Sequence, residues 1–285
     1  MGKISLKGVI DMHVHTNPDL RNRAYTDFQL LEAGIRVGAR AIVIKTHLGS
    51  TVERAYLANQ YMEKVYGGKT GFQLYGGIVL NECVGGINPK AVENALKLGG
   101  KVVWLPTQSA RNHLVKMNQS CENCVEVVRD GKIVPELKTV FSLIRQYNAV
   151  LGTAHISPRE AMIVTEEAKK AGIDKIVITH PEWWVCDWTM EEQKRIVKDY
   201  DVILERCYRQ NLGGGQYKSN LPSNLETINE IGYKNIMIDT DGGQVENPHW
   251  EFAMAECIEY LKDHKIPEEQ IQYMTAELPA KLLGI

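Results

Sequence analysis

The chain places two histidines one residue apart, His13 and His15, directly after its first apolar run, "GVIDM". Side chains at positions i and i+2 of a β-strand point to the same face, so the two imidazoles can face one metal ion together. A His-x-His pair also arises by chance, and one buried beside one solvated histidine is the ordinary alternative. Which interpretation holds depends on the ligands that the rest of the chain supplies.

The composition is that of a globular protein with a sizeable core: 285 residues, 44% of them apolar and 24% charged. A net charge of −2 gives no electrostatic reason to expect nucleic acid or an anionic membrane as a partner. The apolar runs are too short for a membrane span, and the first residues lack the apolar core of a signal peptide. We therefore expect a cytoplasmic protein that acts on a small molecule; a homo-oligomer is compatible with this composition.

The six cysteines are dispersed, which predicts reduced thiols rather than a disulfide framework. Cys121 and Cys124 form a Cys-x-x-Cys pair that suits half of a zinc site or a redox pair. No second such pair lies nearby in the sequence, so a plain loop is the favoured interpretation.

Eight apolar runs rich in β-branched residues alternate with helical patterns. They span residues 7–13, 39–45, 72–81, 101–106, 149–155, 175–180, 201–206 and 235–241. Most are continuously apolar, as in a parallel sheet that is covered on both faces. Eight βα units predict one (β/α)8 TIM barrel domain over residues 1–285, with an open doubly wound sheet as the alternative.

Helix start signals support this division. Ser157 with Glu160, and Thr189 with Glu192, each form a predicted capping box, and Asn88 precedes a proline at another helix start. Two segments depart from the repeat. Residues 124–136, after the fourth strand, predict a small inserted hairpin that turns at Asp130-Gly131, and residues 266–285 predict closing helices.

In a barrel of this kind, the chemistry lies at the carboxyl ends of the strands. Polar residues follow the eight runs there: His13 and His15, Lys45 and His47, Asn81 and Glu82, Thr107 and Gln108, His155, His180, Glu205 and Arg206, and Asp239 and Asp241. Five of the eight histidines fall at these ends, and scattered structural histidines would not gather in this way. We therefore interpret His13 and His15 as the first part of a metal site.

The motifs "DMHVH", "GTAH", "ITHP" and "DTDGG", in this order, resemble the amidohydrolase superfamily of metal-dependent hydrolases. Its members are (β/α)8 barrels, and the branches nearest in pattern are the TatD-like and amidohydrolase-2 groups. The resemblance implies one or two divalent ions, Zn²⁺ before Mn, Fe, Co or Ni, held by residues of the four motifs: His13, His15, His155, His180 and Asp241.

The resemblance also implies roles. Asp241 acts as the base that takes a proton from the metal-activated water and passes it to the leaving group. His180 either completes a second metal site or donates a hydrogen bond to the polarised oxygen of the substrate. Asp239 competes with Asp241, since the two would share a strand face by period 2, but Asp241 is nearer the strand end.

One departure from the family pattern concerns the bridge between two metal ions, usually a carboxylated Lys or a Glu after strand 4. Here that strand ends with neither. Either the site is mononuclear, or Lys45 or Glu205 provides the bridge.

Further residues are candidates for substrate contact: His47, His113, Trp183 and Glu205. Trp184 is interpreted in the same way, although such rings more often only pack a loop. Arg21 and Arg23 suit a substrate carboxylate or phosphate, with solvated loop arginines as the more ordinary interpretation.

These observations predict a divalent-metal hydrolase that cleaves a small polar substrate at a C–N bond of an amide or cyclic amide. A phosphoesterase on the same ligands is the first alternative, but only the glycine-rich stretch 211–220 approaches a phosphate loop. A lactonase or decarboxylase of the same superfamily is a second. A metal-binding protein without turnover is the non-enzymatic alternative.

Overall fold

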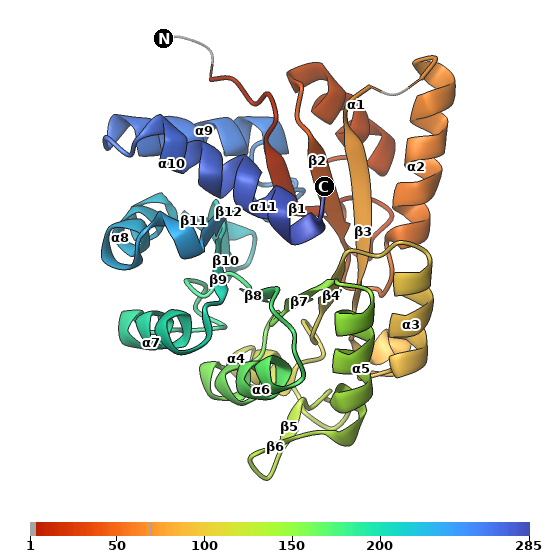
Figure 1. Ribbon diagram of the computed structural model, residues 1–285, viewed down its shortest axis with the longest axis vertical. Helices are drawn as coiled ribbons and strands as arrows, with labels where there is room; N and C mark the ends of the chain where they lie inside the picture. The colour runs from red at the N-terminus through yellow and green to blue at the C-terminus, as the bar shows by residue number, and fades with distance from the viewer. Residues whose placement is uncertain (1–3, 69) are drawn as a thin grey trace. The chain divides into compact units, whose positions relative to one another are not determined.

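The computed structural model describes residues 4–68 and 70–285. Eight parallel strands are hydrogen-bonded in chain order, each to the next (Figure 1). They are β1 (Ile10–His15), β2 (Ala41–Lys45), β3 (Gln73–Val79), β4 (Val102–Trp104), β7 (Val150–Gly152), β8 (Ile176–Ile178), β9 (Ile203–Arg206) and β12 (Ile236–Ile238). A doubly wound sheet would reverse its strand order at one point, so that alternative is wrong and the (β/α)8 prediction is confirmed.

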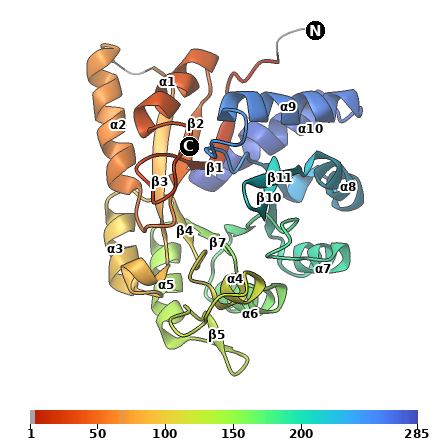
Figure 2. The same cartoon turned by 180° about the vertical axis from the view of Figure 1, so that it is seen from behind.

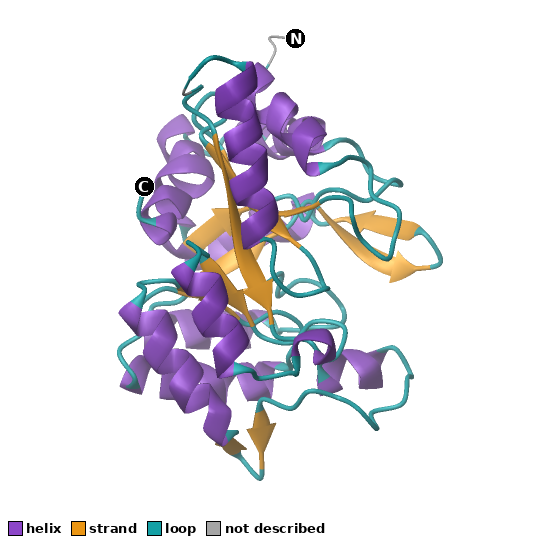
Figure 3. Cartoon of the chain, turned by 90° about the vertical axis from the view of Figure 1, so that its right-hand side faces the viewer, coloured by secondary structure: helices purple, strands orange, loops and turns teal. Residues whose placement is uncertain are grey.

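Helices alternate with these strands (Figure 3). The main ones are α1 (Asp27–Val37), α2 (Val52–Val65), α3 (Pro89–Lys97), α5 (Pro135–Gln146), α6 (Pro158–Lys170), α7 (Met190–Tyr200), α8 (Leu221–Ile231) and α9 (Trp250–Asp263). Short elements add α4 (Arg111–Lys116) and the tail α10 (Glu268–Gln272), η3 (Tyr273–Glu277) and α11 (Leu278–Leu283). No helix among the described residues is both long and apolar enough to cross a membrane.

Contacts divide the chain into two units. The first contains the described residues of Met1–Thr46, Thr51–Gly76 and Arg206–Ile285, and the second those of His47–Ser50 and Gly77–Glu205. In the first unit every residue of β1 and β2 is buried. Helices α1 and α2 lie side by side there, as both faces of the ribbon show (Figures 1 and 2).

The second unit is built on β4, β7 and β8, whose residues are all buried. Trp104 on β4 needs glycine on both neighbouring strands. A Cβ atom at Gly77 would lie 2.6 Å from its ring, and one at Gly152 would lie 2.4 Å from it. The capping boxes predicted at Ser157 and Thr189 are confirmed at the starts of α6 and α7.

The predicted insertion after β4 and the glycine-rich stretch 211–220 each form a hairpin. Strands β5 (Val128–Arg129) and β6 (Lys132–Ile133) are antiparallel, which confirms the predicted turn at Asp130-Gly131. The glycine-rich stretch after β9 is the hairpin of β10 (Arg209–Gly213) and β11 (Gln216–Ser219). Its glycines sit at the tip of a two-stranded ribbon, so they do not form the strand–loop–helix cradle of a phosphate site.

Five strands end earlier than predicted, namely β3, β4, β7, β8 and β12. After the last three of these, the backbone turns sharply at a predicted site residue or one residue before it. Ala154, His180 and Asp241 have φ of 54°, 30° and 47°, in the left-handed region that non-glycine residues rarely adopt. Strand β12 ends at Ile238, so the expectation that Asp239 and Asp241 share one strand face is wrong. His155, His180 and Asp241 are therefore presented by turns rather than by strands.

The turn after Asp241 leaves no room for a side chain at Gly243. A Cβ atom there would lie 1.9 Å from the carbonyl oxygen of His15. We expect Gly243→Ala to lower the unfolding free energy by about 1–3 kcal/mol more than Gly213→Ala, because overpacking is added to the strain of positive φ. Gly213 has φ +93° and nothing within 4 Å of its Cβ position, so it is the matched control. Equal losses in chemical denaturation would contradict this.

Candidate metal centre and histidine cluster

In the first unit, three donor atoms converge at the end of β1. The Nε2 atoms of His13 and His15 are 3.3 Å apart. Oδ1 of Asp241 lies 3.1 Å from the first and 3.2 Å from the second. The two histidines are buried, whereas the Asp241 side chain is 25% exposed. The group of three donors thus consists of two buried imidazole nitrogens and one carboxylate, Asp241, that solvent can reach.

These spacings fit the ligands of one divalent ion. Zinc–nitrogen and zinc–oxygen bonds of about 2.0–2.2 Å place tetrahedral ligand atoms roughly 3.3–3.5 Å apart. Burial, and then the positive charge of Arg23, hold the pKa of His15 well below its ordinary value, so its ring is neutral. Burial raises the pKa of Asp241, but His13 and His15 outweigh it and hold that pKa well below the usual range. The donor set therefore suits a cation.

Two further carboxylates position this set. Oδ1 of Asp11 accepts the backbone N–H of His13 at 3.0 Å, and its Oδ2 accepts the Thr240 hydroxyl at 2.6 Å. Oδ1 of Asp239 accepts the backbone N–H of Met12 at 2.7 Å. Asp239 is thus engaged in tying β12 to β1. Sequence reasoning missed Asp11, whose polarity inside a buried strand was the available signal; burial raises its pKa to about 6.

Lys45, at the end of β2, reaches the same donors. Its Nζ lies 2.9 Å from Nε2 of His13, and its side chain is buried. The sequence makes Lys45 one of two candidates, with Glu205, for a bridge between two metal ions. The structure places it within hydrogen-bond distance of one ligand, and its role as a bridge stays a prediction.

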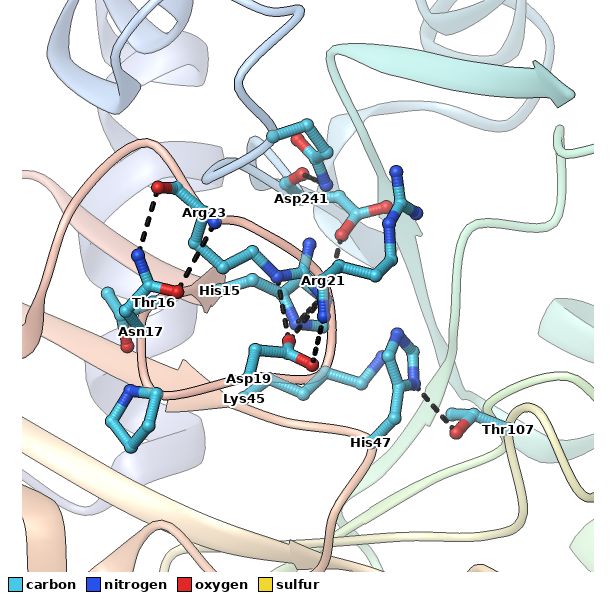
Figure 4. A network of polar contacts seen from close by, with 12 residues as sticks. His15, Thr16, Asn17, Asp19, Arg21, Arg23, Lys45, His47, Thr107 and Asp241 are labelled. Atoms are coloured by element: carbon cyan, nitrogen blue, oxygen red, sulfur yellow. Dashed lines mark hydrogen bonds and ion pairs between the residues drawn. The ribbon is translucent and has the colours of Figure 1, made fainter. Parts of the chain in front are cut away.

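The loop after β1 brings a buried arginine to the other side of His15 (Figure 4). Nη2 of Arg23 lies 2.6 Å from Oδ2 of Asp19 and 3.4 Å from Nδ1 of His15. The interpretation of both loop arginines as solvated is wrong for Arg23, which is 4% exposed and neutralised by Asp19. Arg21 is exposed, as that interpretation expected.

In the second unit, four predicted residues form an aromatic cluster. The ring of His155 lies 5.1 Å from that of His180, 4.8 Å from Trp183 and 5.9 Å from His47, between centroids. Nδ1 of His47 is 2.9 Å from the Thr107 hydroxyl, which fixes the orientation of that ring. The structure therefore brings His47, His155, His180 and Trp183 together within this unit.

His113 and Glu205 contact two members of this cluster. Nδ1 of His113 lies 2.9 Å from Nδ1 of His155, and burial lowers the pKa of His113 to about 4. Oε2 of Glu205 accepts the backbone N–H of His180 at 3.1 Å, and Glu205 is buried. Within this unit each of them contacts a predicted metal ligand, and their predicted roles toward the substrate, or for Glu205 as a bridge, stay predictions.

Trp184 and the pair Cys121 and Cys124 are the remaining candidates from the sequence. Trp184 packs against Trp183, with 6.3 Å between ring centroids. Cys121 and Cys124 are free thiols in the loop after α4, and no third histidine, cysteine or carboxylate of the described chain joins them in a metal-binding group.

The chain is similar in structure to several solved hydrolases. An amidohydrolase from Pseudomonas aeruginosa matches with a TM-score of 0.65 and 12% identity, covering 97% of this chain and 95% of that one. A putative 2-pyrone-4,6-dicarboxylic acid hydrolase from Pseudomonas putida matches with 0.62 and 16%, covering 97% of each chain. The organophosphorus hydrolase from Deinococcus radiodurans matches with 0.61 and 13%, covering 100% and 94%.

The resemblance predicted from the histidine motifs is confirmed at the level of the fold, since these matches to an amidohydrolase and to other hydrolases span nearly the whole chain. Similar structures include enzymes of two kinds, hydrolases and a decarboxylase. Residues 8–205 match the model of a family of unknown function, DUF6282, and the chain belongs to that family. No curated protein matches the chain.

The converging donors predict where metal binds. We expect the double variant His13→Ala, His15→Ala to remain folded and to lose most of its bound metal, because two of the three converging donors are removed. Metal analysis by mass spectrometry after dialysis measures this, with circular dichroism as the folding check. A folded variant with a full complement of metal would place the site elsewhere.

In contrast to the two histidines, Cys121 and Cys124 are not expected to bind metal. We expect Cys121→Ser, Cys124→Ser to change neither the metal content nor the turnover, since two thiols alone do not complete a tetrahedral site. The same metal analysis applies. The loss of one ion per chain would reveal a second metal site at this loop.

Proposed function

We propose that this protein is a divalent-metal-dependent hydrolase, with zinc as the favoured ion, that cleaves a C–N bond of a small polar substrate such as an amide or cyclic amide. The convergence of His13 Nε2, His15 Nε2 and Asp241 Oδ1 within 3.3 Å of one another carries this proposal. The amidohydrolase fold supports it.

A divalent ion at these donors would supply Lewis-acid activation of water at neutral pH. Asp241 has the features of a general base. Both of its histidine contacts engage Oδ1, which leaves Oδ2 to accept a proton from the attacking water and to return it to the leaving nitrogen. Its side chain is partly exposed, so substrate can approach it, and its low pKa keeps it ionised.

We assign His155 and His180 to the same reaction on the order of the sequence motifs, His155 as a ligand and His180 as a ligand or a hydrogen-bond donor to the substrate oxygen. The contact from Glu205 fixes the backbone of His180, and Nδ1 of the His180 ring lies 3.5 Å from Sγ of Cys186. His47 and Trp183, which adjoin His155, are the assigned substrate contacts.

A screen of several bond types tests which bond the protein cleaves. A decarboxylase and hydrolases of different bonds share this fold. A phosphoesterase gains no support from residues 211–220, because they form a hairpin. The test is therefore metal analysis of the purified protein, followed by a screen that sets amides, cyclic amides and lactones beside p-nitrophenyl phosphate. Bound metal without turnover in this screen would favour a binding protein.

Substitutions of the two aspartates after β12 distinguish the catalytic role proposed for Asp241 from the structural role of Asp239. We expect Asp241→Asn to lower kcat by roughly 10²–10⁴, because the amide keeps the size and one oxygen but cannot act as a base. Its metal content should fall less than that of the double histidine variant. Asp239→Asn is the matched control. Its amide oxygen can still accept the Met12 N–H, so kcat should fall much less. Wild-type kcat in Asp241→Asn would refute the role of Asp241.

A further inference from the structure

His113 makes an unusual contact for a residue outside the strand ends. Its ring is buried and stacks on that of His155, with 4.9 Å between centroids and 25° between ring planes. The two Nδ1 atoms are 2.9 Å apart, which is a hydrogen-bond distance. A hydrogen bond between two neutral imidazoles holds one proton, so one Nδ1 donates and the other accepts.

The two arrangements have different consequences for His155. If His113 donates, Nδ1 of His155 is the acceptor, and its Nε2 carries the proton and has no lone pair for a metal. If His155 donates, its Nε2 keeps the lone pair. We propose that His113 is a positioning residue that accepts the Nδ1–H of His155 and thereby keeps the Nε2 lone pair available for the metal. This rests on the ligand role of His155 in the proposed function.

The surroundings of His113 favour such a fixed role over a substrate contact. Its neighbour Asn112 donates through Nδ2 to the carbonyl oxygens of His155, at 3.0 Å, and Val185, at 2.9 Å. Helix α4 is thus anchored to the residue whose ring His113 contacts. Trp183 adjoins both imidazoles, with its ring 4.8 Å from His155 and 5.8 Å from His113. These contacts restrict the rotation of both rings.

The tautomer of His155 can be read directly in the metal-free, full-length protein. Nitrogen-15 NMR distinguishes the protonated from the unprotonated nitrogen of a neutral imidazole. We expect the proton of wild-type His155 on Nδ1. His113→Phe keeps an aromatic ring for stacking but removes the acceptor, and we expect the proton to move to Nε2. His113→Asn places an amide oxygen near the former Nδ1, and we expect it to restore the wild-type tautomer.

Zinc affinity, measured by competition with a chelator, is the second readout. We expect His113→Phe to bind zinc roughly 10–100-fold more weakly, as for other lost partners of metal-ligating histidines, and His113→Asn to bind close to wild type. His264→Phe is the control for the loss of one histidine. His264 is exposed, and its Nδ1 contacts the Tyr260 carbonyl, so neither readout should change.

A proton on Nε2 of wild-type His155, or an unchanged tautomer in a folded His113→Phe, would overturn the proposal. A shifted tautomer with undiminished zinc affinity would overturn the link to the metal. Wild-type protein that binds no divalent metal would refute the proposed function instead. The tautomer readout needs no metal, so it still decides whether His113 accepts from His155.

Discussion

The candidate metal centre depends on buried hydrogen bonds that tie β1 to the segment of β12. Asp11 accepts from Thr240, and Asp239 accepts from the Met12 backbone. Each carboxylate is fully buried, and leaving such a group without a donor would cost far more than one ordinary hydrogen bond contributes. The two strands are therefore held in one register, which brings His13 and His15 to Asp241.

Charge and protonation in the first unit follow from the same burial. A buried imidazole cannot take up a proton without losing solvation, so His15 stays neutral and keeps a lone pair. Arg23 is buried beside it only because Asp19 neutralises the guanidinium. Lys45 adds a basic group next to His13. An incoming cation would therefore meet the ionised carboxylate of Asp241, the neutral ring of His15, the imidazole of His13 and the amine of Lys45.

The sequence predicted the eight βα units and the residues His13, His15 and Asp241, because their types and order in the chain carry the signal. It did not predict the turns at Ala154, His180 and Asp241, since left-handed backbone at non-glycine residues is a local cost that tertiary contacts impose. For the same reason the period-2 argument about Asp239 failed. The ligand roles of His155 and His180 are predictions from the order of the sequence motifs.

Supporting residues were harder to predict than ligands, because support depends on contacts between segments far apart in the chain. The sequence marks Glu205 at a strand end and His113 as a candidate substrate contact, but only the structure shows that Glu205 accepts from the His180 backbone and that His113 contacts the His155 ring. An imidazole in this position differs chemically from the carboxylate or carbonyl that commonly orients a ligating histidine. It adds no negative charge, so it orients His155 without making that ring as basic as a carboxylate partner would. The protein thus combines the three converging donors of its first unit, of which Asp241 is the carboxylate, with a hydrogen-bonded imidazole pair in its second unit.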